Sequence, residues 1–438
     1  MSDPTLATKA DDPAHHGSAL RTAEDPAGAP APAVAGSPRK IMALVMVAAV
    51  GMYIMSLTLS TALSLRLASI DPASKDATYS TAVSISAFGL LIAAPLAGAL
   101  SDRTTGRFGR RRPWIAGCLL VALLGCAVIG TVTSAAVVVV AYLVAILGAQ
   151  VGFNTYAVIP VEGLPEHKRG RVMGVMGMFG ALAFSAGSYL ASGLVGVPLL
   201  MMTVPVLLAI AFSLPLLFLY KDPVKFRGEL PPLDVKAIAR TFVVNPRRHP
   251  DFAWVWLSRL LAGIAMTAMF SYFVYFMMDG LHMPIAEAGA NAGTLSLISA
   301  PVSMLFFTGS GWLADKTGRR KPLVAIAAVL MALALVIGAT STTFAQFTVA
   351  WVVFAVGQAT YLTTDLALCA AVLPDARDTG KDMAVFGLAL NIPNILVPAA
   401  APTVLALGAG HNYRLLWFGA AALCLLGSIT VTFVKGAR

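Results

Sequence analysis

Residues 98–113 read GALSDRTTGRFGRRRP and lie between two long apolar runs. Five arginines share this short segment with a single carboxylate, that of Asp102. A shorter version, GWLADKTGRRKP, is found at residues 311–322, again between two apolar runs. The sequence therefore places charged loops at corresponding points of its two halves.

The composition predicts an integral membrane protein. Of the 438 residues, 58% are hydrophobic and only 12% are charged, and the mean hydropathy is +0.79. An ordinary soluble domain contains about 25% charged residues, so this chain has too few charges to cover a water-facing surface. The net charge is +10, and nearly all of the basic residues lie outside the apolar runs, which indicates membrane topology rather than nucleic-acid binding.

The apolar runs predict an all-α fold with twelve transmembrane helices. A spanning helix needs about 20 apolar residues, and only helices or closed barrels satisfy the backbone within lipid. The third and fourth runs are separated by little more than Thr133 and Ser134. The expected helices cover residues 41–65, 81–100, 113–133, 136–158, 172–195, 198–220, 252–278, 290–313, 322–340, 345–373, 384–407 and 413–435.

The distribution of Lys and Arg predicts the orientation. If the N-terminal tail is cytoplasmic, 27 of the 31 basic residues lie on the inner side, whereas Arg66, Lys75 and Arg414 lie in outer loops. Because cytoplasmic loops are enriched in Lys and Arg, we expect a multi-pass protein of the cell membrane with both termini in the cytoplasm. Residues 1–40 are rich in Ala and Pro without an apolar core, so a disordered cytoplasmic tail is expected there.

The two halves of the chain repeat each other. Residues 98–102 match 311–315 at an offset of 213, and GFNTY at 152–156 matches GQATY at 357–361 at an offset of 205. A parallel repeat of this kind places a transport site between the halves, near the middle of the membrane. We expect six-helix bundles at 41–220 and 252–438, and a cytoplasmic linker with a short amphipathic helix at 221–251.

Asp365 is the strongest candidate for proton coupling. It lies eight residues before Leu373, about 12 Å along the helix from the predicted inner end. A charge at a helix centre costs about 2.5–3.5 kcal/mol, and burial favours the protonated form of a carboxylate. The alternative is a structural carboxylate that pairs with an arginine or bonds to a neighbouring helix.

Arg259 is the only cation in the interior of a predicted span, since Arg414 and Lys435 lie at the ends of the last one. It could pair with a carboxylate such as Asp365, bind an anionic or hydroxyl-rich substrate, or extend along its helix to the inner surface. The three roles remain open from the sequence.

Polar side chains within the spans are candidate substrate ligands, and interhelical hydrogen bonding is the alternative for each. Residues 391–394, Asn-Ile-Pro-Asn, interrupt the eleventh span, since proline frees backbone groups there. The tyrosines of the seventh span could stack on a sugar ring. The candidates are Asn154, Tyr156, Arg259, Tyr272, Tyr275, Tyr361, Thr364, Asn391 and Asn394. The four cysteines lie inside apolar runs without metal-ligand spacing, so neither a metal site nor a disulfide is expected.

The charged loop motifs resemble those of a known family. GALSDRTTGRFGRRRP resembles the signature between the second and third helices of the major facilitator superfamily, and GWLADKTGRRKP resembles its second-half copy. SDRTTGRFGRRRPW and TYLTTDLALCAAVLPDARDTGKD (360–382) are similar to the sucrose and glycoside proton-symporter branch, and EGLPEHKRG (162–170) to a motif of sugar porters. The resemblance covers residues 41–435. It implies two pseudo-symmetric six-helix bundles, a small-molecule substrate and no cofactor.

The resemblance also implies a cytoplasmic gate of salt bridges that breaks when the site opens inward. Asp102 and Asp315 end the second and eighth helices, and in the superfamily such acids face helix N-termini, where the dipole favours negative charge by about 0.3–1 kcal/mol. The arginines could also simply hold their loops on the inner side. The expected gate residues are Asp102, Arg103, Arg107, Arg110, Arg111, Arg112, Glu162, Arg169, Arg171, Asp315, Lys316, Arg319 and Arg320.

Together these features predict a monomeric secondary transporter that moves a sugar or glycoside through the bilayer by proton-coupled alternating access. Proton-coupled efflux of drugs or metabolites is the alternative, although the predicted fifth helix lacks the proline of the Gly-Pro motif that drug antiporters carry. A receptor or sensor is a further possibility. The chain has neither G-x-x-x-x-G-K-[ST] nor H-E-x-x-H, so neither an ATP-driven pump nor an enzyme is expected.

Overall fold

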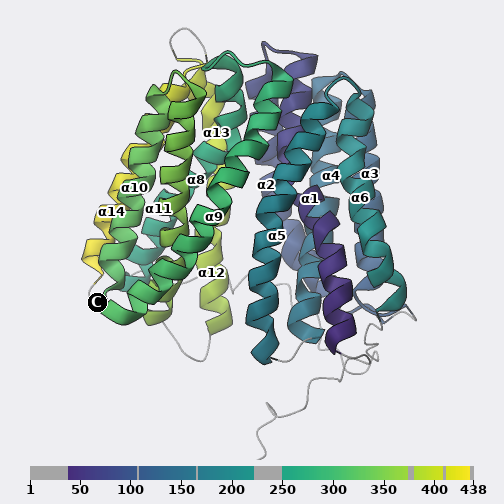
Figure 1. The fold of residues 1–438 in the computed structure, drawn as a ribbon, viewed down its shortest axis with the longest axis horizontal. Coiled ribbons are helices and arrows are strands. Elements are labelled where there is room, and N and C mark those ends of the chain that lie inside the picture. The colour runs from purple at the N-terminus through teal and green to yellow at the C-terminus, as the bar shows by residue number, and fades with distance from the viewer. Residues whose placement is uncertain are drawn as a thin grey trace, which may run out of the picture. The chain divides into compact units, whose positions relative to one another are not determined.

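The computed structural model describes residues 38–105, 108–163, 166–220, 249–372, 379–407 and 411–434, and all regular structure in them is helical (Figure 1). The predicted amphipathic linker helix and nearly all of the predicted tail lie outside these residues. The helices are α1 (Pro38–Ile70), α2 (Lys75–Asp102), α3 (Arg112–Thr131), α4 (Ala135–Gly163), α5 (Glu166–Gly193), α6 (Pro198–Leu219), α8 (Pro250–Asp279), α9 (Ile285–Thr317), α10 (Arg320–Thr340), α11 (Phe344–Ala371), α12 (Thr379–Asn391), α13 (Pro393–Leu405), α14 (Tyr413–Thr430) and the short η3 (Val431–Phe433).

These helices account for the twelve predicted spans, with α12 and α13 forming one of them and η3 extending the last. In the described part of the chain, eleven segments are long and apolar enough to cross a membrane, and α12 with α13 makes one of them. The remaining predicted span corresponds to α5, which is 28 residues long and is not among the eleven. The prediction of an all-α, multi-pass membrane protein is confirmed.

The first half (α1–α6) and the second half (α8–α14) use the same helix pairs. In the first half, α1 packs against α4, α5 and α6, α3 packs against α4 and α6, and α2 packs against α4. In the second half, α8 packs against α11, the α12–α13 helix and α14, α10 packs against α11 and α14, and α9 packs against α11. Each of these helix pairs in the second half is equivalent to a helix pair in the first half. The fold is therefore two pseudo-symmetric six-helix bundles.

The repeat extends to individual atoms. A methyl group added at Gly148 of α4 would come within 2.7 Å of Ala122 N and Cys118 O of α3. One added at Gly357 of α11 would come within 2.9 Å of Met331 N and Ala327 O of α10.

Each of these second-half residues lies 209 positions after its counterpart. The structure therefore pairs Gly357 with Gly148, whereas the motif match at an offset of 205 paired it with Gly152. In both halves, a missing side chain thus lets two helix backbones approach closely, as is common where helices associate in membranes.

The predicted interruption of the eleventh span is present. α12 ends at Asn391, Ile392 forms a turn, and Pro393 begins α13. Proline has no N–H group to continue the helical hydrogen bonds, so the span is divided into two segments. Both segments pack against α8, and α13 also packs against α2 of the first half.

Arg66 was predicted to lie in an outer loop, but it belongs to the last turns of α1 and its side chain is buried. Its Nε donates to Ile129 O at 3.2 Å and its Nη2 to Val132 O at 2.9 Å. These carbonyls end α3, where a helix lacks donors and carries partial negative charge. Arg66 thereby caps α3 instead of lying in water.

The glycine contacts generate a test of the repeat. We expect Gly148→Ala and Gly357→Ala each to destabilise the protein by about 1–3 kcal/mol, because the added methyl overpacks the helix contact. Thermal unfolding in detergent measures the effect. Gly117→Ala and Gly419→Ala are the matched controls, since nothing lies within 4 Å of an added methyl there. Equal stability of all four variants would contradict the close contact.

Candidate functional site

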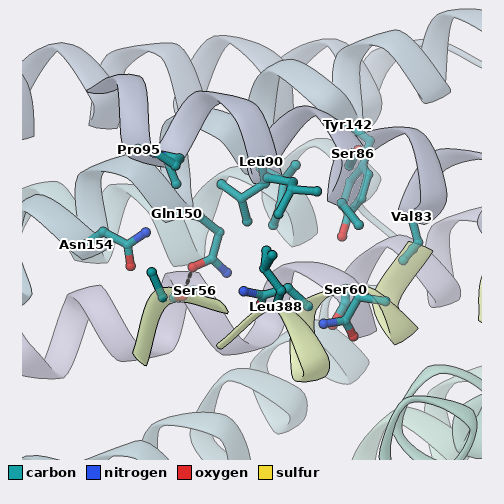
Figure 2. A pocket seen from close by; sticks show the side chains of 17 residues that line it. Ser56, Ser60, Val83, Ser86, Leu90, Pro95, Tyr142, Gln150, Asn154 and Leu388 are labelled. Atoms are coloured by element: carbon teal, nitrogen blue, oxygen red, sulfur yellow. Dashed lines mark hydrogen bonds between the residues drawn. The ribbon is translucent and has the colours of Figure 1, made fainter. Parts of the chain in front are cut away.

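A cavity of about 400 Å³ lies between α1, α2 and α4 of the first half and α12 and α13 of the second (Figure 2). Three of the predicted substrate ligands, Asn154, Asn391 and Asn394, are brought together in its wall. Gln150 joins them and accepts a hydrogen bond from Ser56 Oγ at 3.1 Å. We call this space the amide cavity, because carboxamide side chains from both halves line it.

The helical period explains how α4 contributes to the amide cavity. Tyr142, Ile146, Gln150 and Asn154 all line it and follow one another at intervals of four residues. Residues at this spacing lie on one face of a helix. The face becomes more polar along the helix, and it ends in the two carboxamides.

A second cavity, of about 370 Å³, lies between α1, α5, α8, α9 and α11. Five aromatic side chains contribute to its wall: Phe184, Phe270, Phe273, Trp351 and Phe354. Its hydroxyl groups include that of Ser299, which accepts a hydrogen bond from Trp351 Nε1 at 3.3 Å. We call this space the aromatic cavity. Ser60 of α1 lines both cavities.

Within the described part of the chain, neither cavity is lined by an acidic or basic side chain. The polar groups that face the two spaces are hydroxyls and carboxamides. Burying an ion without a partner is far more costly than burying a neutral hydrogen-bonding group. The cavities therefore suit an uncharged molecule that has both polar groups and an apolar or ring surface.

The structure pairs Arg259 of α8 with Asp365 of α11. Nη1 of Arg259 donates to Oδ2 of Asp365, and the side chains are only 11% and 1% exposed. The guanidinium carbon also lies 3.9 Å from the centre of the Phe386 ring of α12, a favourable cation–π contact. Arg259 is thus held between α11 and α12 and does not extend to the surface.

Oδ1 of Asp365 has no hydrogen-bond partner among the described residues. A buried carboxylate oxygen without a partner is costly, and it is the atom at which a proton can be added. Neither Asp365 nor Arg259 lines the two cavities. The ion pair therefore lies outside the walls of the two candidate substrate cavities.

The other substrate candidates, except Tyr275, form hydrogen bonds within or between helices. Tyr156 donates to Val45 O of α1 at 2.8 Å, and Tyr361 pairs with Ser258 Oγ of α8 at 3.2 Å. Tyr272 pairs with Ser80 Oγ of α2 at 2.7 Å. Thr364 donates to a carbonyl of its own helix at 2.7 Å, and the Tyr275 ring lies under the Lys75 ammonium at 5.8 Å. The bonds of Tyr156, Tyr361 and Tyr272 match the alternative of helix association.

Where the structure describes them, the contacts of the predicted gate residues each lie within one half. Asp102 pairs with Arg111 at 2.8 Å and with Arg110 at 3.6 Å, all within the first half. Arg320 donates to Ala367 O at 2.7 Å within the second half. We call the end of the bundles where α2 and α9 end and α3 and α10 begin the arginine-rich end. Arg103 and Arg112 are partly buried near it, whereas Asp315, Lys316 and Arg319 are exposed. Arg107 and the side chains of Glu162, Arg169 and Arg171 lie outside the described residues.

Sequence reasoning missed most of the cavity lining. The missed polar residues are Ser56, Ser60, Thr61, Ser86, Tyr142, Gln150, Ser296, Ser299, Ser303 and Gln358. A signal was present for some of them, because positions 296, 299 and 303 share one face of α9 and positions 56 and 60 share one face of α1. Small hydroxyl residues are common in transmembrane helices, so they do not stand out in an apolar run.

Comparison with known proteins agrees with this architecture. The family model described as Major Facilitator Superfamily matches residues 41–310 and 255–437. No curated protein matches the sequence significantly.

Two solved structures resemble the fold. A mutant of the nucleoside transporter NupG is 12% identical, with a TM-score of 0.72 over 90% of this chain and 99% of that one. A bacterial homologue of the human lysosomal transporter Spinster, inward-facing and unoccupied, is 14% identical, with a TM-score of 0.60 over 91% and 96%.

The buried ion pair generates a test of coupling. We expect Arg259→Met to lower the free energy of unfolding by about 3–5 kcal/mol, because it leaves the Asp365 carboxylate buried without a partner. Adding Asp365→Leu should restore part of this loss, since an apolar pair replaces the ionic one. Chemical unfolding in detergent gives the values, with Arg319→Met as the control for loss of an exposed arginine. If the double variant is no more stable than Arg259→Met, the two side chains are not coupled.

Proposed function

This chain belongs to the major facilitator superfamily, and we propose that it is a proton-coupled secondary transporter of a neutral sugar or glycoside. The family and its structural neighbours are transporters, so the protein is a transporter rather than an enzyme. The observation that carries the proposal is the uncharged lining of the two cavities between the halves. An ionised substrate would find no opposite charge in them among the described residues.

The two cavities suit a molecule with two kinds of surface. The amide cavity offers donors and acceptors from Gln150, Asn154, Asn391 and Asn394, which match the hydroxyl groups of a sugar ring. The aromatic cavity offers the faces and edges of Trp351 and four phenylalanines, which match the apolar faces of a ring or an aglycone. A nucleoside, the substrate named for NupG, combines the same two kinds of surface and belongs among the test compounds.

Asp365 is the proposed carrier of the coupled proton. Its buried Oδ1 without a hydrogen-bond partner can accept a proton, and protonation would weaken the bond from Arg259 to Oδ2. Because Arg259 also contacts Phe386 of α12, this change would reach the helix that supplies Leu388 and Asn391 to the amide cavity. A change in protonation is thereby coupled to the wall of the proposed substrate site.

The proposed orientation places the arginine-rich end in the cytoplasm, as the 27 basic residues on that side favour. We propose that the charged groups of this end form a cytoplasmic gate. Asp102 already pairs with Arg110 and Arg111 in the first half. Asp315 is exposed at the corresponding position of the second half.

Transport by the purified protein in proteoliposomes tests the function. Neutral disaccharides, glycosides and nucleosides are compared with cationic drugs, with and without an imposed proton gradient. The proposal expects accumulation of a neutral compound that depends on the gradient. Export of cationic drugs with no uptake of neutral sugars would favour the efflux alternative and contradict our proposal.

Asp365→Asn separates proton coupling from substrate movement. We expect loss of gradient-driven accumulation, because an amide cannot carry the proton, together with retained exchange of labelled for unlabelled substrate. Glu287→Gln removes an exposed carboxylate at the start of α9 and should behave as the unsubstituted protein. Undiminished accumulation by Asp365→Asn would exclude this residue as the carrier.

Gln150→Ala tests the amide cavity. Loss of one neutral hydrogen bond is worth about 0.5–1.5 kcal/mol, so KM for uptake should rise roughly twofold to tenfold. Gln346→Ala is the matched control, because this glutamine is exposed at the start of α11 and lines neither cavity. The same KM for both variants would place the substrate elsewhere.

A further inference from the structure

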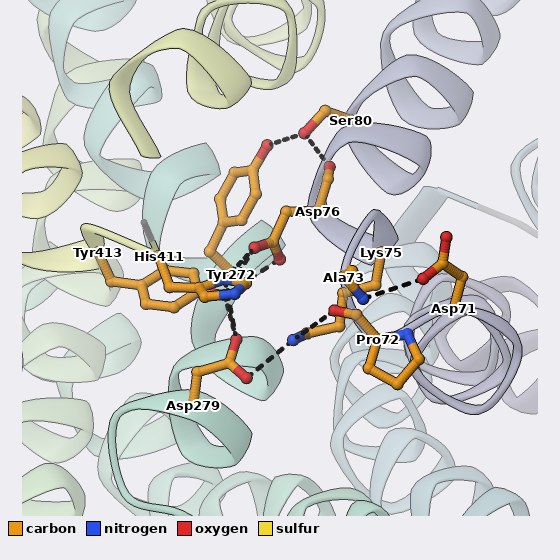
Figure 3. Close-up of polar contacts among 10 residues, drawn as sticks. All are labelled: Asp71, Pro72, Ala73, Lys75, Asp76, Ser80, Tyr272, Asp279, His411 and Tyr413. Carbon is orange, nitrogen blue, oxygen red and sulfur yellow. Dashed lines mark hydrogen bonds and ion pairs between the residues drawn. The ribbon is translucent and has the colours of Figure 1, made fainter. Parts of the chain in front are cut away.

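A network of charged side chains joins the two halves (Figure 3). It lies at the end opposite the arginine-rich end, since Lys75 begins α2 and Asp102 ends it. Lys75 and Asp76 begin α2 of the first half, and Asp279 ends α8 of the second half. Lys75 Nζ lies 2.8 Å from Asp279 Oδ1. His411 Nδ1, in the loop before α14, lies 2.7 Å from Asp76 Oδ2 and 3.5 Å from Asp279 Oδ2.

Hydroxyl groups complete this junction. Tyr413 of α14 donates toward both carboxylates, with its oxygen 2.6 Å from Asp279 Oδ2 and 3.0 Å from Asp76 Oδ1. One turn along α2, Ser80 pairs with Tyr272 of α8 at 2.7 Å. Among the described residues, the ion pairs that connect the two halves are Lys75–Asp279 and His411–Asp76, whereas those of Asp102 and Asp365 each lie within one half.

With both carboxylates ionised, the network carries one excess negative charge, which a proton on His411 balances. Asp76 and Asp279 supply two negative charges and Lys75 supplies one positive charge. A neutral imidazole can still donate from Nδ1–H to Asp76, and the added proton then goes to Nε2. A positive charge close to two carboxylates is stabilised by both of them.

The His411 side chain is exposed enough to take up a proton directly from water. This side chain is 42% exposed, whereas those of Lys75, Asp76 and Asp279 are 5%, 11% and 21% exposed. The other titratable groups at this junction are Tyr79, Tyr272 and Tyr275 in the interior and Arg414 at the surface. Asp71 lies in the adjoining loop, where hydrogen bonds from Ser74 and Ala73 hold the pKa of its carboxyl below the ordinary value.

We propose that His411, with Asp76 and Asp279, forms a second proton-binding site between the halves. It binds a proton more tightly while the halves are joined at this end than when they are apart. When the halves separate, His411 loses the carboxylate of Asp76, which belongs to the first half. By linkage, a proton bound at His411 favours the joined state. Histidine changes charge between about pH 5 and 8, so acidification on this side of the membrane closes this end.

This inference rests on the proposed function in one respect, that the halves separate at this end during transport. It concerns residues distinct from Asp365, and it can be measured without a transported substrate. Thr133 and Ala286 are exposed positions at this end, one in each half. Spin labels on Thr133→Cys and Ala286→Cys, with the four native cysteines replaced, report the distance between the halves in the full-length protein.

The ratio of short to long distances is followed from pH 8 to pH 5. We expect this ratio to increase severalfold. If the joined state binds the proton about ten times more tightly than the separated state, the ratio can increase by at most about tenfold. His411→Gln should remove this response, because glutamine retains a hydrogen bond but takes up no proton. His282→Gln, at an exposed histidine just beyond α8, should retain it. Asp279→Asn should reduce it, since one carboxylate that favours the proton is lost.

An unchanged ratio across this pH range in the unsubstituted protein would overturn the proposal, as would an unreduced response in His411→Gln. Melting temperatures verify that each variant is folded. The two proposals can fail separately. Proton-dependent distances without transport of any neutral compound would refute the proposed function alone, whereas proton-driven transport with a normal pH response in His411→Gln would refute this site alone.

Discussion

Hydrocarbon offers no hydrogen-bond partner to a charge or to the last carbonyls of a helix, and this constraint decides how the buried polar residues of the protein are arranged. Arg66 supplies the missing donors at the end of α3. Arg259 and Asp365 neutralise each other between α8 and α11. Each of these pairings connects two helices, so the same contacts that make charge tolerable in the membrane also determine which helices stay together.

α8 shows this arrangement most clearly. Arg259 and Asp279 lie 20 residues apart on it, or about 30 Å along its axis. Between them, Phe270 and Phe273 face the aromatic cavity, and Thr267 donates to Asn394 of the amide cavity wall at 3.1 Å. A single helix thus lines the aromatic cavity, bonds to a wall residue of the amide cavity and forms two interhelical ion pairs. Its counterpart in the first half, α1, contributes serine hydroxyls to the cavities instead of aromatic rings.

Much of the fold could be predicted from the sequence, because long apolar runs and repeated loop motifs are strong signals. The break at Ile392 was also predictable, since proline cannot continue a helix. The cavity lining was not, because a serine that faces a cavity and one that bonds to its own helix look alike in a sequence. Tyr156 and Tyr361 illustrate the difficulty, since both were candidate ligands and both hold helices together. The junction at Asp76 and His411 was missed for a related reason, as charges at helix ends resemble ordinary loop residues.

The close contact of α3 with α4, and its copy between α10 and α11, has a consequence for the history and the engineering of the protein. Gly148 and Gly357 keep one common register, as expected of a duplicated gene whose products still share a backbone frame. The side chains that line the cavities have meanwhile diverged. Specificity and scaffold are therefore separable in this protein. Lining residues of one half could be transplanted to the equivalent positions of the other while the helix contacts that hold each bundle stay intact.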